Sequence, residues 1–153
     1  MMVSVIIPNL HSPLVAGVIA ALRAQTPAGQ VGEIIVVGMD RFGQVQPDAL
    51  VQFIRTEQPV SAAVARNLGA AAARGEYLLF VDADCLLEPG AVAQLLAAIG
   101  AGYGAVLGGV VPERERYWVL CGNLMAFPEF LSVDPPGERV PQSGAAQSGA
   151  CYE

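Results

Sequence analysis

Two aspartates, Asp82 and Asp84, have the residue type and spacing that most directly suggest chemistry in this sequence. They follow the apolar run from Tyr77 to Val81, which is typical of a buried strand. Because side chains alternate between the faces of a strand, residues two apart point the same way, and the small Ala83 turns away. Two neighbouring carboxylates repel each other unless a cation lies between them. The spacing therefore predicts a site for a hard divalent ion, Mg²⁺ or Mn²⁺.

The same region also has a plainer interpretation. The aspartates could form a polar strand end, with Asp84 or Glu88 capping the next helix. Arg66, on the preceding alanine-rich segment, is either a solvated side chain or a contact to phosphate or base. Asn67 beside it either bonds nearby backbone or contacts a ligand. The metal site is favoured because the carboxylates directly follow a buried strand within an α/β pattern.

The elements that must position these residues alternate in type along the chain. Strands are predicted at Val3 to Ile7, Glu33 to Val37, Val51 to Arg55, Tyr77 to Val81 and Ala105 to Val111. The first predicted helix has Ser12 as its N-cap and Pro13 at its first position, and it ends near Thr26-Pro27. The second runs from Ser61 to Arg74, with Val64, Leu68 and Ala72 as its core face. The third runs from Pro89 to Ile99. This rhythm predicts an α/β fold with a mainly parallel central sheet flanked by helices.

The second half of the chain has a weaker pattern. Tyr117 to Phe127 is interpreted as helix or strand, Asp134 to Gly137 as a loop, and Gln142 to Tyr152 as a strand. No internal repeat or linker divides the sequence, so a single domain is predicted over residues 1–153.

Ligands of such sheets bind at the carboxyl ends of the strands. Pro8, the segment from Gly38 to Asp40 and the aspartate pair all follow strands, so we expect them at one edge. The helix from Ser61 begins there too, which brings Arg66 toward the same crevice. His11, in the loop after the first strand, is expected to be a solvated loop residue.

The composition excludes several classes of function. A chain that is 54% hydrophobic and 14% charged is not disordered. A net charge of −6 without any basic run argues against nucleic-acid binding. Glycines and prolines interrupt the uncharged stretches, so no transmembrane segment is predicted. The widely spaced Cys85, Cys121 and Cys151 predict reduced thiols in a cytoplasmic protein and no zinc site.

Two nucleotide-binding motifs are also absent from the sequence. The segment Pro8 to Pro13 stands where a GxGxxG would follow the first strand, and no GxxxxGK[ST] occurs. NAD-dependent redox chemistry and P-loop NTPase activity are therefore disfavoured.

Four segments together resemble the family 2 glycosyltransferases of the GT-A fold. They are SVIIPNL at 4–10, EIIVV at 33–37, ARNLGAAAARGEYLLFVDAD at 65–84 and EPGAV at 88–92. The resemblance implies a Rossmann-like nucleotide-diphospho-sugar transferase that takes a UDP- or GDP-sugar. It also implies a divalent metal, Mn²⁺ or Mg²⁺, that bridges the aspartates and the diphosphate, and transfer with inversion at the anomeric carbon.

The resemblance also assigns roles by position. Pro8 and Asn9 would line the nucleoside pocket, and Arg66 would lie near the base or the diphosphate. Asp82 would lie toward the ribose and the metal, and Asp84 would be the main metal ligand.

Two positions depart from the family pattern. The family usually has two aspartates directly after the second strand, where Gly38 and Met39 stand here, so Asp40 is the candidate substitute for the contact to the base. His11 stands where an asparagine is common.

The end of the chain departs further. The stretch from Ser148 to Glu153 resembles the strand before the family's acceptor-side helix, so the domain is expected to be incomplete at its C-terminus. Four acids are available in this part of the chain, Glu113, Glu129, Asp134 and Glu153. None of them matches the family's position for the catalytic base. The catalytic residue is therefore unknown.

The sequence favours a glycosyltransferase over two alternatives. One is a non-catalytic or truncated nucleotide-sugar-binding module that a partner completes. The other, a sugar-nucleotidyltransferase, is disfavoured because its glycine-rich first loop is missing. The acceptor, peripheral contact with a membrane and association into a homo-oligomer stay open.

Overall fold

The computed structural model describes residues 1–25 and 28–109. The chain packs as two compact units, and the fold described below belongs to the unit that contains Met1–Gly104. Residues 105–109, the described part of the other unit, form no helix or strand. The strand predicted from Ala105 to Val111 is therefore wrong over these residues, where glycines at 104, 108 and 109 weaken extended pairing. The predictions for Tyr117 to Phe127, Asp134 to Gly137 and Gln142 to Tyr152 lie outside the described residues.

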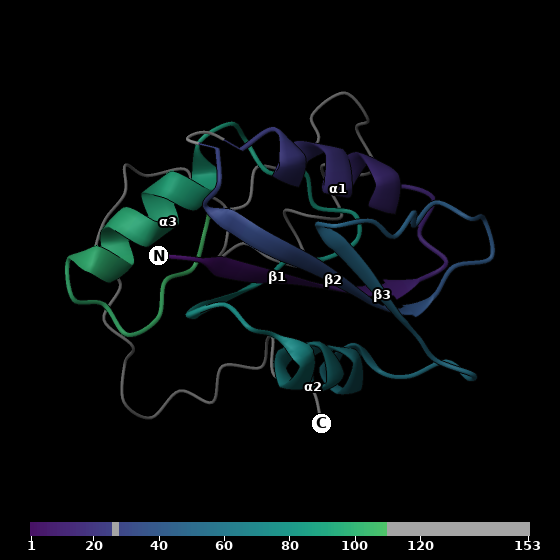
Figure 1. Ribbon diagram of the computed structural model, residues 1–153. Helices are drawn as coiled ribbons and strands as arrows, with labels where there is room; N and C mark the ends of the chain where they lie inside the picture. Colours follow the sequence, from purple (N-terminus) through teal and green to yellow (C-terminus); the bar gives the residue numbers. More distant parts are fainter. Residues whose placement is uncertain (26–27, 110–153) are drawn as a thin grey trace, which may run out of the picture. The chain divides into compact units, whose positions relative to one another are not determined.

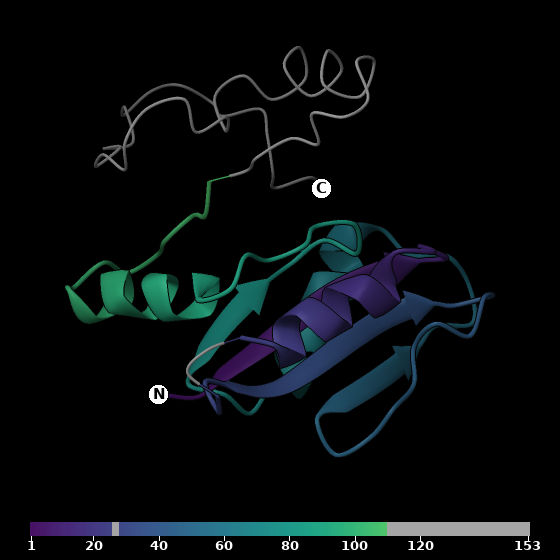
Figure 2. The same ribbon diagram turned by 90° about the horizontal axis from the view of Figure 1, so that it is seen from above.

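Four parallel strands form the sheet, in the order β3-β2-β1-β4 (Figures 1 and 2). They are β1 (Val3–Leu10), β2 (Val31–Met39), β3 (Val51–Arg55) and β4 (Tyr77–Phe80). Helices α1 (Val15–Arg23) and α3 (Ala91–Gly100) contribute to the hydrophobic core on one face, and α2 (Ala62–Ala72) covers the other (Figure 1). Helices on both faces explain why β1 and β2 are apolar almost throughout. The predicted parallel α/β sheet is confirmed.

β1 continues to Leu10 instead of ending at Pro8. The backbone carbonyl of Ile6 accepts a hydrogen bond from the backbone N–H of Val81 at 3.1 Å, so Ile6 faces the β4 side. Residues two apart face the same side of a strand, so Pro8 also faces β4, which has already ended at Phe80. The missing N–H of the proline therefore interrupts no hydrogen bond to β4.

The helix α2 packs on the sheet through smaller residues than predicted. Val64 and Leu68 are 45% and 42% exposed, whereas Ala65 and Gly69 are buried. A Cβ atom at Gly69 would lie 2.5 Å from Cγ2 of Ile6, so the helix backbone rests directly on β1. The predicted core face is wrong at Val64 and Leu68, because only small side chains fit at this distance, and is confirmed at Ala72, which packs against the core.

The strand β4 is half-buried. Tyr77 and Leu79 are partly covered, while Leu78 and Phe80 are 45% and 47% exposed. The prediction of a strand here is confirmed, but the prediction that it is buried holds for neither Leu78 nor Phe80.

One of the two predicted helix caps is confirmed. The side-chain oxygen of Ser61 accepts a hydrogen bond from the backbone N–H of Val64 at 3.3 Å, at the start of α2. The helix α1 begins later than predicted, after Leu14, and has no side-chain cap. The prediction that Ser12 caps α1 is wrong, because the hydroxyl of Ser12 donates to a distant loop.

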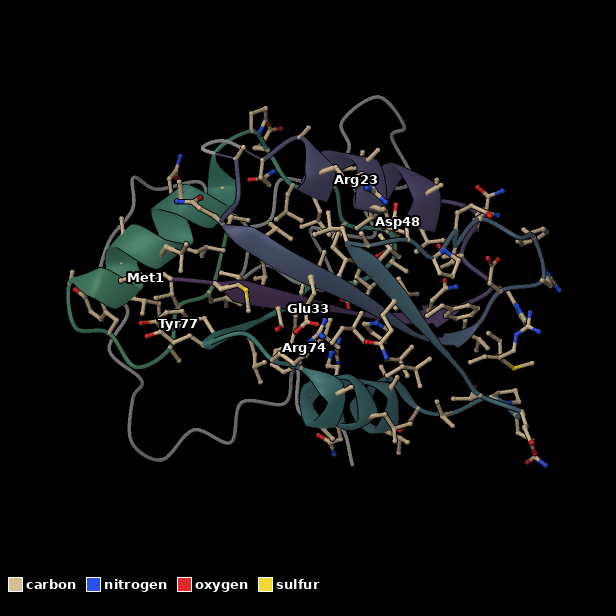
Figure 3. The ribbon with its side chains drawn as sticks, viewed as in Figure 1. Met1, Arg23, Glu33, Asp48, Arg74 and Tyr77 are labelled. Carbon is tan, nitrogen blue, oxygen red and sulfur yellow. The ribbon has the colours of Figure 1, made fainter. Side chains whose placement is uncertain are left out.

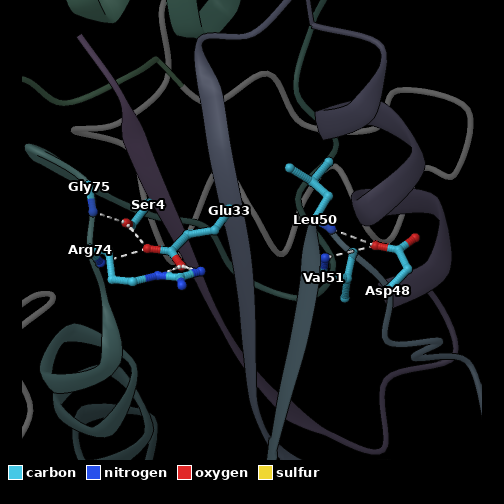
Figure 4. A network of polar contacts seen from close by, with 7 residues as sticks. All are labelled: Ser4, Glu33, Asp48, Leu50, Val51, Arg74 and Gly75. Atoms are coloured by element: carbon cyan, nitrogen blue, oxygen red, sulfur yellow. Dashed lines mark hydrogen bonds and ion pairs between the residues drawn. The ribbon is translucent and has the colours of Figure 1, made fainter.

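A buried network joins the end of α2 and the start of β4 to the sheet (Figures 3 and 4). The Ser4 hydroxyl donates to Oε1 of Glu33 at 2.6 Å and accepts from the Gly75 N–H at 2.7 Å. Arg74 donates to Glu33 through its backbone N–H at 2.6 Å and through its guanidinium at 2.9 and 3.1 Å. Burial alone would raise the pKa of Glu33, but these hydrogen bonds and the Arg74 charge hold it below its ordinary value.

Asp48 organises the turn before β3 (Figure 4). Its carboxylate accepts from the backbone N–H groups of Leu50 and Val51 at 2.8 and 2.9 Å, and it pairs with Arg23. The hydrogen bond from Val51, followed by those from Arg23 and Leu50, lowers the pKa of Asp48.

Candidate functional site

The carboxyl ends of the parallel strands bring Arg66 and Asp82 together. Arg66 projects from α2, and its Nη2 donates to Oδ1 of Asp82 at 2.7 Å. The two side chains are 28% and 55% exposed, so both remain accessible to a solute. The arginine expected at this crevice therefore contacts one of the two predicted metal-binding carboxylates.

The two aspartates lie in a turn, not in the strand. β4 ends at Phe80, and the Cys85 N–H donates to the Asp82 carbonyl at 3.0 Å, which closes the turn. Asp82 and Asp84 are exposed on either side of Ala83, which is buried. Strand alternation predicted that the two aspartates point one way and Ala83 another. The exposure of the aspartates and the burial of Ala83 agree with this prediction, but a turn and not a strand produces them.

The thiol of Cys85 lies in the field of both aspartates. Its sulfur is 3.7 Å from Oδ1 of Asp84. Desolvation of the sulfur, followed by the charges of Asp84 and Asp82, raises the pKa of the thiol to about 11. Negative charge is therefore concentrated at this turn.

Asn9, which the family resemblance assigns to the nucleoside pocket, lies within β1 next to its last residue and is 3% exposed. Its Nδ2 donates to the Met39 carbonyl at 3.0 Å, and its Oδ1 accepts from the Ser12 N–H at 3.1 Å. Pro8 precedes it within β1 and is partly buried. Both ends of the Asn9 amide thus bind protein backbone.

Asp40 directly follows β2 and is 8% exposed. Its Oδ1 accepts from the Phe42 N–H at 3.1 Å, and its Oδ2 accepts from the Val45 N–H at 2.7 Å. Both oxygens of this candidate base contact therefore accept from the backbone of the loop after β2 and shape that loop.

His11 has a positive φ of 58°, a conformation that asparagine and glycine adopt more readily than most residues. The Nδ1 atom accepts from the Arg41 N–H at 3.1 Å, and the His11 N–H donates to the Met39 carbonyl at 2.9 Å. The expectation of a merely solvated residue is wrong, because His11 joins the loops after β1 and β2.

A depression of about 320 Å³ opens beside these loops at the ends of β1, β2 and β3. It is lined by His11, Met39, Asp40, Arg41, Arg55, Thr56 and Glu57. The Arg41 and Arg55 guanidinium groups lie over the rings of Phe42 and Phe53, at 4.7 and 5.9 Å from the ring centres. The depression therefore offers cationic hydrogen-bond donors to a bound solute.

Sequence reasoning missed the role of Ser12. Its hydroxyl donates to the Ala83 carbonyl at 2.9 Å, across 71 residues of sequence, and accepts from the Leu14 N–H at 3.2 Å. The Ser-Pro pair carries a local signal for a helix cap and none for a contact with the aspartate turn.

The donor set fits a cation that also binds a ligand. No three His, Cys, Asp or Glu side chains gather into a metal-binding cluster within residues 1–25 and 28–109. Mg²⁺ commonly takes one or two carboxylates and completes its coordination with water and substrate phosphates. Asp82 and Asp84 match this donor set.

Within residues 1–25 and 28–109, no helix has the length and hydropathy needed to cross a membrane.

Residues 4–120 match the family described as Glycosyl transferase family 2. Among solved structures, the chain is similar to S. aureus TarS 1–349, with 22% identity and a TM-score of 0.55 over 74% of this chain and 39% of that one. It is also similar to the mannosyltransferase PcManGT from Pyrobaculum calidifontis, solved with GDP-Man and Mn²⁺. That match has 25% identity and a TM-score of 0.55 over 77% of this chain and 38% of that one. The comparison with curated proteins gives no match. The chain spans about two fifths of the length of each solved structure.

Proposed function

Because the chain belongs to glycosyl transferase family 2, we propose that it binds a nucleotide-diphosphate sugar together with Mn²⁺ or Mg²⁺. The sugar is transferred to an acceptor with inversion at the anomeric carbon. The donor lies along the carboxyl ends of the strands, from the depression beside β2 to the turn after β4. The protein acts in the cytoplasm, where its three cysteines stay reduced.

The Arg66–Asp82 pair, with Asp84 in the same turn, is the observation that carries the proposal. It combines one guanidinium, which suits a phosphate oxygen, with two exposed carboxylates, which suit a hard cation. Asp84 serves as the main metal ligand, and Asp82 lies toward the metal and the ribose. When bound, the cation offsets the charge of the diphosphate leaving group.

The loops after β1 and β2 hold the nucleoside. Pro8 and Asn9 form the end of β1, and Asp40 fixes the loop that borders the depression. Support for this donor class comes from the similar mannosyltransferase, which was solved with GDP-Man and Mn²⁺. UDP- and GDP-sugars are therefore the donors to test first.

Calorimetric titration of the full chain with UDP and with GDP tests the donor site. Nucleotide should bind in the presence of Mn²⁺ and far more weakly after chelation. Asp84→Asn should weaken the Mn²⁺-dependent binding by about ten- to 100-fold, since a hydrogen-bonded or ligating charge contributes roughly 1.5–3 kcal/mol. Glu88→Gln, which removes an exposed acid from the same loop, should bind like the wild type. Equal affinity with and without metal would show that the cation does not bridge protein and donor.

A second candidate function is a nucleotide-sugar-binding module that a partner completes. The side chains assigned at the site, Arg66, Asp82 and Asp84, suit donor and cation binding, and none of the three is assigned to activate an acceptor. Metal-dependent hydrolysis of a UDP- or GDP-sugar separates the two functions. Slow release of sugar by the full chain supports an assembled transferase site, and tight binding without release supports the module.

A further inference from the structure

A series of hydrogen bonds connects the ends of three strands. Asn9 donates from Nδ2 to the Met39 carbonyl at the end of β2, at 3.0 Å. Its Oδ1 accepts from the backbone N–H of Ser12 at 3.1 Å, and the Ser12 hydroxyl donates to the Ala83 carbonyl at 2.9 Å. These contacts, here called the Asn9–Ser12 relay, reach from β2 through the β1 loop to the turn after β4.

The relay meets the aspartate turn at its centre. Ala83 is 9% exposed, and its carbonyl belongs to the peptide group that leads into Asp84. A peptide group is planar, so the hydrogen bond that fixes this carbonyl also fixes the direction in which the chain enters Asp84. The bond from the Cys85 N–H to the Asp82 carbonyl holds the other side of the turn.

We propose that Ser12 and Asn9 are positioning residues for the Asp82–Asp84 turn. Ser12 holds the peptide between Ala83 and Asp84, and Asn9 holds Ser12. The inference rests on the proposed function in one respect, namely that this turn binds the divalent cation. The hydrogen bonds by which Asn9 and Ser12 hold the turn are independent of whether a cation binds there.

The hydroxyl of Ser12 uses its single hydrogen for the bond to the aspartate turn. It has one hydrogen, which goes to Ala83, and its oxygen accepts from the Leu14 N–H. An alanine at position 12 leaves the partly buried Ala83 carbonyl without this donor, so the turn must move to reach water. A threonine keeps the hydroxyl.

The relay also couples the two ends of the proposed donor site. Met39, whose carbonyl receives the Asn9 amide, directly precedes Asp40 and its loop. The nucleoside side and the metal side are therefore braced through Asn9 and Ser12, so a change at Ser12 reaches the turn without altering any carboxylate.

Two measurements on the full chain carrying Ser12→Ala test the inference. The first is amide hydrogen exchange at Cys85 in metal-free protein, which reports the turn directly. The second is Mn²⁺ binding, followed by the electron paramagnetic resonance signal of free Mn²⁺. Exchange should quicken and affinity should fall, each by about two- to tenfold, the factor that corresponds to one net hydrogen bond.

Three further variants show whether the effect comes from the relay. Ser61→Ala removes a hydroxyl that caps α2, and should lower stability without changing either measurement at the turn. Ser12→Thr should restore both values. Ser12→Cys, with a weak donor of similar size, should lie between wild type and Ser12→Ala and provides a test if the alanine variant does not fold.

The two proposals fail in different ways. Unchanged Cys85 exchange in Ser12→Ala, or equal changes in Ser61→Ala, would overturn the positioning role. Faster exchange in a protein whose wild type binds no Mn²⁺ would support the positioning role and reject the metal site. Faster exchange together with weaker Mn²⁺ binding supports both.

Discussion

At the proposed metal site, Arg66 and a divalent cation would compete for the same carboxylate. The guanidinium lies 2.7 Å from Oδ1 of Asp82, so a cation that binds this oxygen must displace it. A donor diphosphate changes the balance, because its oxygens offer the guanidinium another partner. The two ligands of the proposed site should therefore respond to Arg66 in opposite directions.

Substitution Arg66→Gln should raise the affinity for Mn²⁺ alone by about two- to fivefold, since an exposed ion pair contributes roughly 0.2–1 kcal/mol. The same variant should weaken Mn²⁺-dependent UDP or GDP binding by about tenfold or more, because a charged donor to phosphate is lost. Paramagnetic resonance and calorimetry measure the two affinities separately. Arg23→Gln, which breaks an exposed pair with Asp48, is the matched control and should change neither. Weaker binding of Mn²⁺ alone in Arg66→Gln would contradict the competition.

At this scale, sequence reasoning located residues better than it assigned their contacts. Strand ends placed Pro8, Asp40 and the aspartate pair at one edge because parallel strands bring their carboxyl ends together, and the start of the next helix brought Arg66 there. The sequence did not show that the side chains of Asn9 and Asp40 form hydrogen bonds with backbone groups. The Ser12 contact with Ala83 was equally inaccessible, because it depends on how two distant loops approach each other.

Among the secondary-structure elements, α2 shows how a helix can pack through its smallest residues. Hydrophobic periodicity selects the largest apolar side chains as the buried face, which gave Val64 and Leu68. The helix instead presents Ala65 and Gly69 to the sheet, since its backbone lies against Ile6. The existence, type and order of the elements followed from local pattern, whereas the distance between helix and sheet did not.

Gly69→Ala should therefore destabilise the protein by about 1–3 kcal/mol, the usual range for overpacking, despite the better helix propensity of alanine. The new Cβ would meet the buried and stiff Ile6 side chain at 2.5 Å. Gly100→Ala makes the same change in α3, where nothing lies within 4 Å, and should stabilise by up to about 1 kcal/mol. Urea unfolding monitored by circular dichroism compares the two. A Gly69→Ala protein as stable as Gly100→Ala would show that the helix can move away at little cost.

At the scale of the molecule, the Glu33 network is a polar connection between elements distant in sequence. It joins Ser4 of β1, Glu33 of β2 and the Arg74-Gly75 segment that leads into β4 (Figure 4). The carboxylate is 3% exposed, and every bond that it receives favours its charged form. Part of the folding stability should therefore depend on pH through this group.

The pKa of Glu33 is below its ordinary value of 4.5 in the folded protein, so its contribution is complete above that pH. It is lost as the pH falls through the lowered folded-state pKa. Glu33→Gln should cost about 1–3 kcal/mol at pH 7 and progressively less below pH 4.5. Urea unfolding at a series of pH values measures the difference. Glu88→Gln, at an exposed glutamate, should have the same free energy of unfolding as the wild type at every pH. A difference between Glu33→Gln and the wild type that stays constant with pH would argue against the ionised network.

β1 is the first strand to be synthesised, yet it pairs on one side with β4, where Val3 lies opposite Tyr77. Strands β1, β2 and β3 can associate through short connections, whereas docking β4 closes the chain from Val3 to Tyr77. Closing a longer loop costs more entropy, and non-local pairings form slowly. A nascent chain therefore presents one edge of β1 until Phe80 has left the ribosome, and an open edge can pair with another chain. The strand that directly precedes the turn with Asp82 and Asp84 is thus also the one whose docking covers this edge of β1 in the growing protein.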